Sequence, residues 1–276
     1  MKTPSDPTFP PAIEAALARI AIETGVPPPS LDSADALALT NGARGDGALL
    51  KRWLKRRFAG EPLPYILGEF RYRGRRFRID KRAYITDPES MHLVEAVLAW
   101  IDRFTAAQGR APLVAEFGCG CGSLGLSLKL ERPGIALVGL DIDPDALALA
   151  RLNAAALQAE AQLIESDLFD AWPHPTPPDL VFGDPPWGTE EDLYDEQRDA
   201  AYYHAMPAVS AFPLGGRTGA HRQILRALAS LGWSSHVILN CGVLPAAEVA
   251  ALGQTSHWHE IAHPAPGISV LHCRMH

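Results

Sequence analysis

From residue 110 onward, short apolar runs alternate with longer helical stretches, and this alternation constrains the fold more than any other feature. The apolar runs are typical of buried strands, and the stretches between them are long enough to form helices. Repetition of strand and helix along a chain predicts a doubly wound parallel sheet with helices on both faces. The predicted strands are residues 112–117, 135–140, 161–165, 179–183 and 235–240.

Both ends of the chain depart from this alternation. Residues 258–262 and 268–273 flank a proline- and glycine-rich turn, which predicts an antiparallel hairpin after the parallel strands. Residues 11–58 have helical patterns, and residues 70–79 alternate large and basic side chains around a glycine, as a hairpin would. We therefore expect an N-terminal helical domain (1–68), a linking β-hairpin (69–86) and an α/β domain (87–276) with a Rossmann-like sheet.

Composition restricts the class of protein. The chain of 276 residues is 47% hydrophobic and 21% charged, which is ordinary for a globular protein with a sizeable core. No apolar run approaches the roughly 20 residues that span a membrane. The four cysteines have no framework spacing, which fits a reducing compartment. We expect a cytoplasmic monomer.

Charge is distributed unevenly along the chain. The formal net charge is −7, yet residues 51–82 hold twelve Lys and Arg against three acids, so this segment carries +9 and the remainder −16. A basic segment on an acidic body suggests contact with an anionic partner, either nucleic acid or an acidic protein surface. Solvated faces of a helix and a hairpin explain the same pattern equally well.

A glycine-rich loop follows the first predicted strand. Gly118, Gly120 and Gly122 alternate with cysteines, and alternate glycines let a backbone turn tightly and approach a ligand at a helix N-terminus. Two cysteines at this spacing could chelate a metal, but no His pair or nearby cysteine completes a known site. We expect small side chains filling a tight loop, and no metal.

An acid follows the loop at the spacing of a nucleoside site. Asp141 ends the second predicted strand, nineteen residues after Gly122, where a carboxylate can accept both ribose hydroxyls. Glu116, just before the glycines, would repel a pyrophosphate but suits an ammonium group. S-adenosylmethionine, an adenosine carrying a sulfonium and an amino acid, satisfies these constraints. Its adenine amino group would donate to Asp167, and its ring would lie between Ile142 and Leu168.

The fourth predicted strand stops at the tetrad Asp184-Pro185-Pro186-Trp187. Two prolines fix the backbone and remove two amide donors, and the residue before a proline is held extended. This turn offers a carboxylate, a free carbonyl and an aromatic face, which together can hold a planar NH2 group. The two hydrogens would go to Asp184 and to the Pro185 carbonyl, with Trp187 against the face. A proline turn that merely ends a strand is the alternative.

Together these motifs resemble the HemK/PrmC methyltransferases over about residues 45 to 230. The resemblance rests on the tetrad, the glycine loop with Glu116, Asp141 with the alanine-rich helix that follows, residues 60–68 (Gly-Glu-Pro-Leu-Pro-Tyr-Ile-Leu-Gly), and residues 214–219 (Leu-Gly-Gly-Arg-Thr-Gly). It implies a class I methyltransferase fold behind an N-terminal helical domain. It also implies transfer of a methyl group from S-adenosylmethionine to the side-chain amide nitrogen of a glutamine in a peptide release factor.

Two positions depart from the family's pattern. The family's tetrad usually reads Asn-Pro-Pro-Tyr, where this chain has Asp184 and Trp187. The family's Pro-Arg-Pro-Glu-Thr-Glu segment is here Thr86-Asp87-Pro88-Glu89-Ser90-Met91, so that an Asp replaces an Arg. Asp at the start of the tetrad is more familiar in enzymes that methylate adenine amino groups. Neither change argues against methyl transfer. Both changes bear on which molecule accepts the methyl group.

Several acceptors therefore remain open. A glutamine amide of a protein comes first, because the N-terminal helices and hairpin resemble the family's partner-binding part. A small molecule with an amine, amide or guanidinium comes second, and nucleic-acid adenine third. A cofactor-binding protein without turnover is the non-enzymatic alternative. The acidic stretch at residues 190–199, with Tyr194, Tyr202 and Tyr203, is either a lid over the acceptor or a solvated loop-helix.

Overall fold

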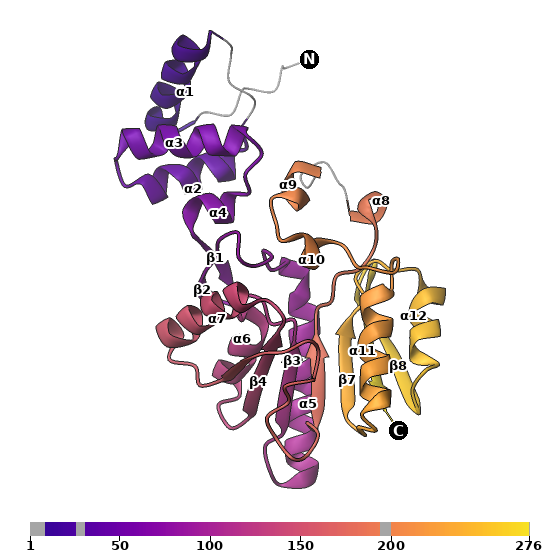
Figure 1. The fold of residues 1–276 in the computed structure, drawn as a ribbon. Helices are drawn as coiled ribbons and strands as arrows, with labels where there is room; N and C mark the ends of the chain where they lie inside the picture. Colours follow the sequence, from indigo (N-terminus) through magenta and orange to yellow (C-terminus); the bar gives the residue numbers. More distant parts are fainter. Residues whose placement is uncertain (1–8, 26–30, 194–199, 276) are drawn as a thin grey trace. The chain divides into compact units, whose positions relative to one another are not determined.

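A computed structural model describes residues 9–25, 31–193 and 200–275 of the chain. They fold as two compact units, Met1–Glu69 and Phe70–His276 (Figure 1). The hairpin that follows residue 69 thus belongs to the second unit by its contacts. None of the helices in the described ranges combines the length and the apolar character needed to cross a membrane.

The first unit is a small bundle of helices around its own apolar core. Asp32 and Asp46 cap the second and third helices, because their side chains accept hydrogen bonds from the first backbone N–H groups of each helix. Ile13, Leu39 and Leu54 are fully buried at the centre of the bundle. The helices are α1 (Pro11–Thr24), α2 (Ser33–Ala43), α3 (Gly47–Phe58) and α4 (Leu63–Leu67).

A seven-stranded sheet forms the centre of the second unit. Its strand order is β5-β4-β3-β6-β7-β9-β8, parallel from β5 to β7 and antiparallel from β7 through β9 to β8. The predicted α/β sheet with a closing hairpin is confirmed. The strands are β3 (Leu113–Phe117), β4 (Ala136–Asp141), β5 (Gln162–Glu165), β6 (Leu180–Gly183), β7 (His236–Asn240), β8 (Trp258–Ala265) and β9 (Ile268–Arg274).

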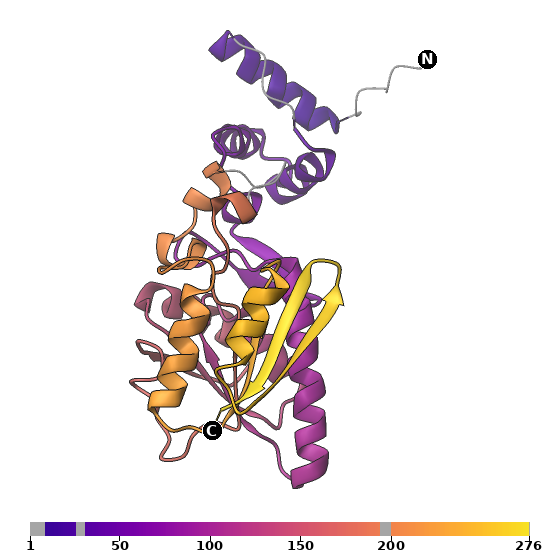
Figure 2. The same cartoon turned by 90° about the vertical axis from the view of Figure 1, so that its right-hand side faces the viewer.

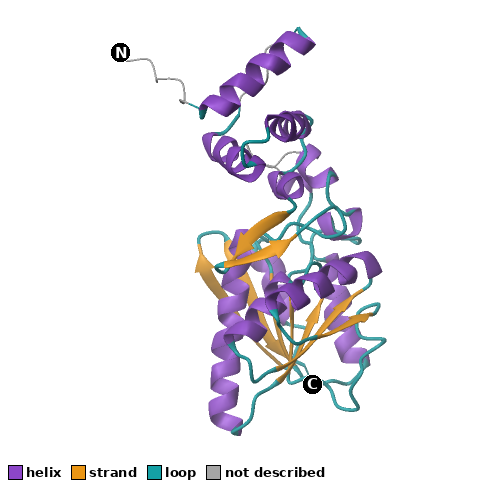
Figure 3. Cartoon of the chain, turned by 90° about the vertical axis from the view of Figure 1, so that its left-hand side faces the viewer, coloured by secondary structure: helices purple, strands orange, loops and turns teal. Residues whose placement is uncertain are grey.

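Helices cover both faces of this sheet (Figures 2 and 3). Alternate residues of β3 point to opposite faces, so Val114 joins one apolar cluster and Ala115 the other. The first cluster includes side chains of α5 (Met91–Gln108), α6 (Ser123–Glu131) and α7 (Pro144–Leu157). The second includes side chains of α11 (Gly219–Ser230) and α12 (Ala246–Gly253).

The strand order reverses direction between β3 and β6. Strand β3 connects outward to β4 and β5, whereas β6 lies on its other side and connects to β7. Such a switch point leaves a crevice at the carboxyl ends of the strands, where ligands bind in open α/β sheets. The glycine loop follows β3 and the proline tetrad follows β6, so both predicted motifs lie at this crevice.

The described part of this unit also contains short helices: η1 (Pro88–Ser90), α8 (Glu190–Leu193), α9 (Ala200–His204) and α10 (Ala208–Ala211).

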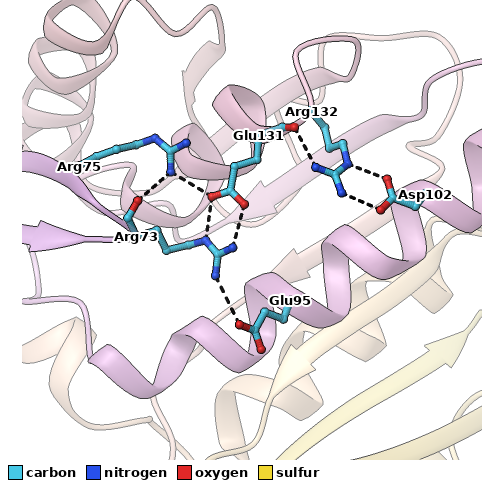
Figure 4. Close-up of polar contacts among 6 residues, drawn as sticks. All are labelled: Arg73, Arg75, Glu95, Asp102, Glu131 and Arg132. Atoms are coloured by element: carbon cyan, nitrogen blue, oxygen red, sulfur yellow. Dashed lines mark hydrogen bonds and ion pairs between the residues drawn. The ribbon is translucent and has the colours of Figure 1, made fainter.

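Ion pairs hold the hairpin of β1 (Glu69–Tyr72) and β2 (Arg75–Arg78) against helix α6, within the second unit. Glu131 at the end of α6 accepts from Nε and Nη2 of Arg73, both at 2.8 Å, and from Arg75 at 3.0 Å (Figure 4). Phe77 and Tyr72 of the hairpin are buried in the cluster under α5 and α6. The hairpin is therefore held by packing and by charge.

Most of the basic segment is engaged in such contacts. Within the first unit, Arg56 pairs with Glu61 at 2.6 Å and Arg57 with Asp35 at 2.6 Å. Of the carboxylates that pair with these cations, Glu23, Asp35 and Glu131 lie outside the segment, so they offset about a third of its +9 charge within the protein. The other paired cations are Lys51 and Lys55 with Glu23, Arg73 and Arg75 with Glu131, and Arg82 with Asp80.

The substitution Glu131→Gln is expected to lower the free energy of unfolding by about 1.5–3 kcal/mol, because two partly buried guanidinium groups lose their charged acceptor. The side chains of Arg73 and Glu131 are only 17% and 21% exposed. Urea denaturation followed by tryptophan fluorescence measures the change. Asp102→Asn is the matched control, since the Asp102–Arg132 pair is exposed and should contribute about 0–1 kcal/mol. Equal shifts for both variants would contradict the anchoring role of Glu131.

Candidate active site

A pocket of about 610 Å³ opens at the switch point of the sheet. This volume lies within the range of about 300–1,000 Å³ typical of small-molecule sites. The pocket is lined by residues from the carboxyl ends of β3, β4, β5, β6 and β7, from the segment before η1, and from the helices after β6. Every predicted site residue except Gly122 lines it: Glu116, Gly118, Gly120, Asp141, Ile142, Asp167, Leu168, Asp184, Pro185, Pro186 and Trp187.

The glycine loop has a backbone that other residues rarely adopt. Gly118, Gly120 and Gly122 have φ values of 59°, 54° and 80°, all in the left-handed region that favours glycine. A Cβ atom at Gly118 or Gly120 would meet nothing within 4 Å, so open space lies beside the loop backbone at both positions. A ligand can therefore come close to the loop backbone, as the alternate glycines predicted.

Both loop cysteines are buried structural groups. Cys119 and Cys121 are 5% and 2% exposed, and the side chain of Cys119 packs against Gly139 of β4. Burial raises the pKa of both thiols, so they stay protonated and unsuited to metal binding at neutral pH. Within the described ranges, no three His, Cys, Asp or Glu side chains gather as a metal site requires.

Asp141 supports the loop and faces the pocket. One carboxylate oxygen accepts from Gly120 N at 2.7 Å and the other from Asp143 N at 3.0 Å. A carboxylate has about four acceptor positions, so each oxygen can still accept a hydroxyl. Burial raises the pKa of Asp141 and the two backbone donors oppose that rise. Beyond it, Ile142 is 52% exposed, which leaves an apolar side chain free to cover a ring.

Glu116 lies beneath the loop rather than in solvent. Its side chain is 2% exposed and accepts from Gly125 N of α6 at 3.1 Å. A Cβ at Gly125 would come within 2.1 Å of this carboxylate, so the glycine makes the approach possible. Burial raises the pKa of Glu116 to about 8, with a smaller contribution from the charge of Asp141. The carboxyl group therefore gains its charge only when a cation is near or the pH is high.

The tetrad is held at the other side of the pocket. Asn240, at the end of β7, donates from Nδ2 to Asp184 Oδ1 at 2.8 Å, and its own Oδ1 accepts from Gly242 N at 3.1 Å. Among the described residues Asn240 is the sole donor to this carboxylate, and no hydrogen bond reaches the Pro185 carbonyl. Trp187 packs on Gly242, where a Cβ would lie 2.1 Å from the indole.

Burial also changes the ionisation of the tetrad. It raises the pKa of Asp184 to about 7; the hydrogen bond from Asn240 opposes this rise and the charge of Asp87 adds to it. The carboxylate and the free carbonyl of Pro185 form two acceptors on one rigid turn. Two acceptors and a neighbouring indole are what an NH2 group needs for orientation.

Sequence reasoning did not identify several residues around the tetrad. Asn240 ends an apolar strand. A polar residue at the carboxyl end of a parallel strand was the one signal in the sequence that could have indicated it as a site residue. Tyr84 and Thr86 line the pocket from the segment before η1, and Thr86 Oγ1 lies 2.5 Å from Ser123 Oγ. Tyr203, which the sequence placed in the stretch that is either a lid or a solvated loop-helix, is buried and lines the pocket from α9.

Part of the acidic stretch after the tetrad lines the pocket. Asp192 of α8 lines the pocket and pairs with Arg217, and it also accepts from Thr189 N at 2.7 Å. The residues Tyr194, Asp195, Glu196 and Asp199 of this stretch lie outside the described residues. A lid over the acceptor therefore stays a prediction.

Known proteins are similar to this chain in sequence and in fold. The family model "Methyltransferase small domain" matches residues 97–202. A release factor glutamine methyltransferase of Cereibacter sphaeroides is 32% identical over 202 residues, which are 72% of this chain and 68% of the relative. The relative from Koribacter versatilis is 32% identical over 180 residues, 65% of this chain. The chain spans about half to three fifths of the first relatives it matches, with shares of 60%, 53% and 53%.

A solved structure supports the fold. A T. thermophilus 16S rRNA N2 methyltransferase, in complex with AdoMet and guanosine, superposes with a TM-score of 0.52 at 20% identity, covering 75% of this chain and 50% of that chain. The α/β sheet described above is thus the class I methyltransferase fold. With 32% identity over two thirds of a full relative, the chain belongs to the HemK/PrmC family of release factor glutamine methyltransferases.

Proposed function

We propose that this protein is an S-adenosylmethionine-dependent N-methyltransferase that acts on a glutamine side-chain amide of a peptide release factor. The observation that carries the proposal is the shared pocket. It brings the glycine loop of β3 together with a rigid Asp-Pro-Pro-Trp turn whose carbonyl and carboxylate are open acceptors. The relatives' names support the acceptor.

The residues of the pocket fit this cofactor. The open space beside Gly118 and Gly120 accommodates the amino acid part, and Glu116 lies beneath it to match an ammonium group. Asp141 keeps acceptor positions for the ribose hydroxyls, Ile142 and Leu168 supply apolar contact for the ring, and Asp167 an acceptor for the adenine amino group. When bound, S-adenosylmethionine supplies an activated methyl group.

The tetrad would prepare the nucleophile. The amide donates its two hydrogens to Asp184 and to the Pro185 carbonyl, which directs the nitrogen lone pair away from them. Alignment of this kind supplies several kcal/mol of barrier reduction in enzymes generally. The nitrogen gains a methyl group and loses one proton, and Asp184 is placed to accept that proton. Trp187 lies beside these acceptors and restricts the plane of the amide.

A macromolecular acceptor also fits the rim of the pocket. Leu214 is 90% exposed and Val243 46% exposed, and both line the pocket. Exposed aliphatic side chains at the mouth of a site favour an acceptor large enough to cover them. All four cysteines are free and buried, which agrees with action in a reducing compartment such as the cytoplasm.

Purified release factor incubated with labelled cofactor is expected to gain one methyl group. Peptide mass spectrometry should map it to a glutamine, and a release factor with that glutamine replaced by asparagine should gain none. Label that appears in a small-metabolite extract and not in the factor would move the acceptor to a small amine, amide or guanidinium. Label in nucleic acid, with affinity falling steeply as salt rises, would indicate adenine.

A further inference from the structure

The turn that follows β7 contacts both ends of the tetrad. Asn240 donates from Nδ2 to Oδ1 of Asp184, and the indole of Trp187 packs on Gly242. Gly242 has a φ of 48°, in the left-handed region that favours glycine, and a Cβ there would overlap the indole. The prolines make the tetrad rigid, and this turn sets where its carboxylate and its aromatic ring lie.

The side-chain amide of Asn240 is fixed in one orientation. Gly242 N lies 3.1 Å from its Oδ1, and a backbone N–H can only donate, so the amide oxygen faces Gly242. The amide nitrogen then faces Asp184, at 2.8 Å from Oδ1. The main chain is held too, because the Asn240 carbonyl lies 2.8 Å from Nε2 of His221 on α11. Burial lowers the pKa of His221 to about 4, so the ring is neutral and Nε2 carries the donated proton.

This orientation restricts what residue 184 can present to Asn240. The nitrogen Nδ2 can only donate, so the atom opposite it must accept. Asp184 meets this requirement with Oδ1 and keeps Oδ2, to which none of the described residues donates, for the NH2 group of the acceptor. An asparagine at position 184 would also turn its oxygen toward Asn240, and its own NH2 group would then face the NH2 group of the acceptor. Two donors cannot bond to each other, so both would be left unpaired.

We propose that Asn240 is a positioning residue for methyl transfer: it determines which atom of residue 184 faces the acceptor nitrogen, and it requires Asp at the position where the family usually has Asn. The inference rests on the proposed function, because it takes the acceptor to be an NH2 group held at Asp184. It makes the identities of residues 184 and 240 depend on each other, although 56 positions of sequence separate them. The Asp of the tetrad then follows from its neighbour on β7, and no adenine acceptor is needed to account for it.

Exchanging the two residues tests this directly. In Asp184→Asn the acceptor faces a donor, and kcat/KM should fall about 100-fold, as for a buried hydrogen-bonding group left unpaired. Asn240→Asp sets two carboxyl groups against each other and should cause a similar loss. In the double variant Asp184→Asn/Asn240→Asp, the new asparagine donates to the new carboxylate and turns its oxygen to the acceptor. Its kcat/KM should exceed that of either single variant by roughly tenfold or more, a non-additivity that only groups in contact show.

The design isolates orientation from other effects. Asp184→Asn and the double variant both lack the carboxylate that takes the proton, so their difference does not contain proton acceptance. Asn240→Asp combined with Asp102→Asn has the same composition and formal charge as the exchange, yet Asp102 is an exposed residue of α5 outside the pocket. This control should stay as low as Asn240→Asp alone, and near-normal cofactor affinity shows that each variant is folded. A double variant no more active than the better single variant, or equalled by the control, would overturn the proposal.

A measurement without any acceptor separates this inference from the proposed function. The full-length variants are made with isotope-labelled asparagine, and NMR follows the exchange of the new NH2 group at position 184 with water. In Asp184→Asn this group faces the pocket and should exchange roughly tenfold faster than in the double variant, where it donates to the new carboxylate. That difference supports the inference even if no release factor is methylated, a result that would reject the proposed function alone. Equal exchange rates in the two variants reject the inference, whatever the turnover.

Discussion

The substitution Asp184→Ala is expected to reduce methyl transfer by about 10³-fold, within the range of about 10²–10⁴ for loss of a group that handles a proton in the transition state. The variant loses one of two acceptors for the NH2 group and the group that takes the proton. Asp184 is held by Asn240, and the glycine loop lies on a neighbouring strand, so cofactor affinity should change by less than about tenfold. Single-turnover rates and equilibrium cofactor binding measure the two effects separately.

The pH profile distinguishes the carboxylate from other polar groups at this position. Because the pKa of Asp184 is raised to about 7, the fraction of ionised, accepting carboxylate rises as the pH increases through 7. At saturating cofactor, where the ionisation of Glu116 no longer limits binding, the wild-type kcat/KM for the acceptor should therefore rise with pH up to about 7–8 and level off. Asp184→Asn, which restores the residue usual in the family, should retain part of the activity and lose this rise. An Asn variant that keeps the same pH dependence would exclude Asp184 as its source.

The backbone of the site was predictable because it follows from residue type. Proline, glycine and runs of apolar residues restrict the main chain locally, so the strand that ends at Asp184 and the loop around Gly120 appear in the pattern itself. The order of the strands then places both motifs at one crevice. The side chains that hold the tetrad were not predictable in this way. Asn240 reaches Asp184 across 56 positions of sequence, and only the pairing of β6 with β7 brings them together.

The burial and pairing of charged side chains also could not be predicted from the sequence pattern. The sequence shows Glu116 as an acid before a glycine loop and does not show its burial, whereas the structure covers it with α6 and raises its pKa to about 8. Likewise the basic hairpin reads as a surface for anions, whereas Arg73 and Arg75 are paired with Glu131. In both cases an element distant in sequence provides the burial or the partner. Charge in a sequence therefore indicates which side chains need partners, and tertiary contacts decide whether they have them.

Glu116→Gln is expected to weaken cofactor binding about 100-fold at pH 8.5 and much less at pH 6, as for the loss of a charged partner of a buried cation. The raised pKa of Glu116 means that the free protein holds this carboxyl protonated below about pH 8. A cationic ligand stabilises the ionised form, so binding releases a proton below that pH and affinity increases with pH until the carboxyl is ionised. The glutamine side chain keeps an acceptor for Gly125 N, so the loop geometry should survive.

Calorimetry in two buffers of different ionisation enthalpy counts the released protons. In the wild type near pH 7 the count should exceed that of Glu116→Gln by close to one, because the amino group of the cofactor and all other titrating side chains are common to both proteins. Asp143→Asn is the control, since it removes a carboxylate from the same side of the pocket where Asp143 caps α7. If Glu116→Gln and the wild type release equal numbers of protons, the buried carboxylate does not bind the cationic end of the cofactor, and the cofactor's ammonium group must lie elsewhere in the pocket.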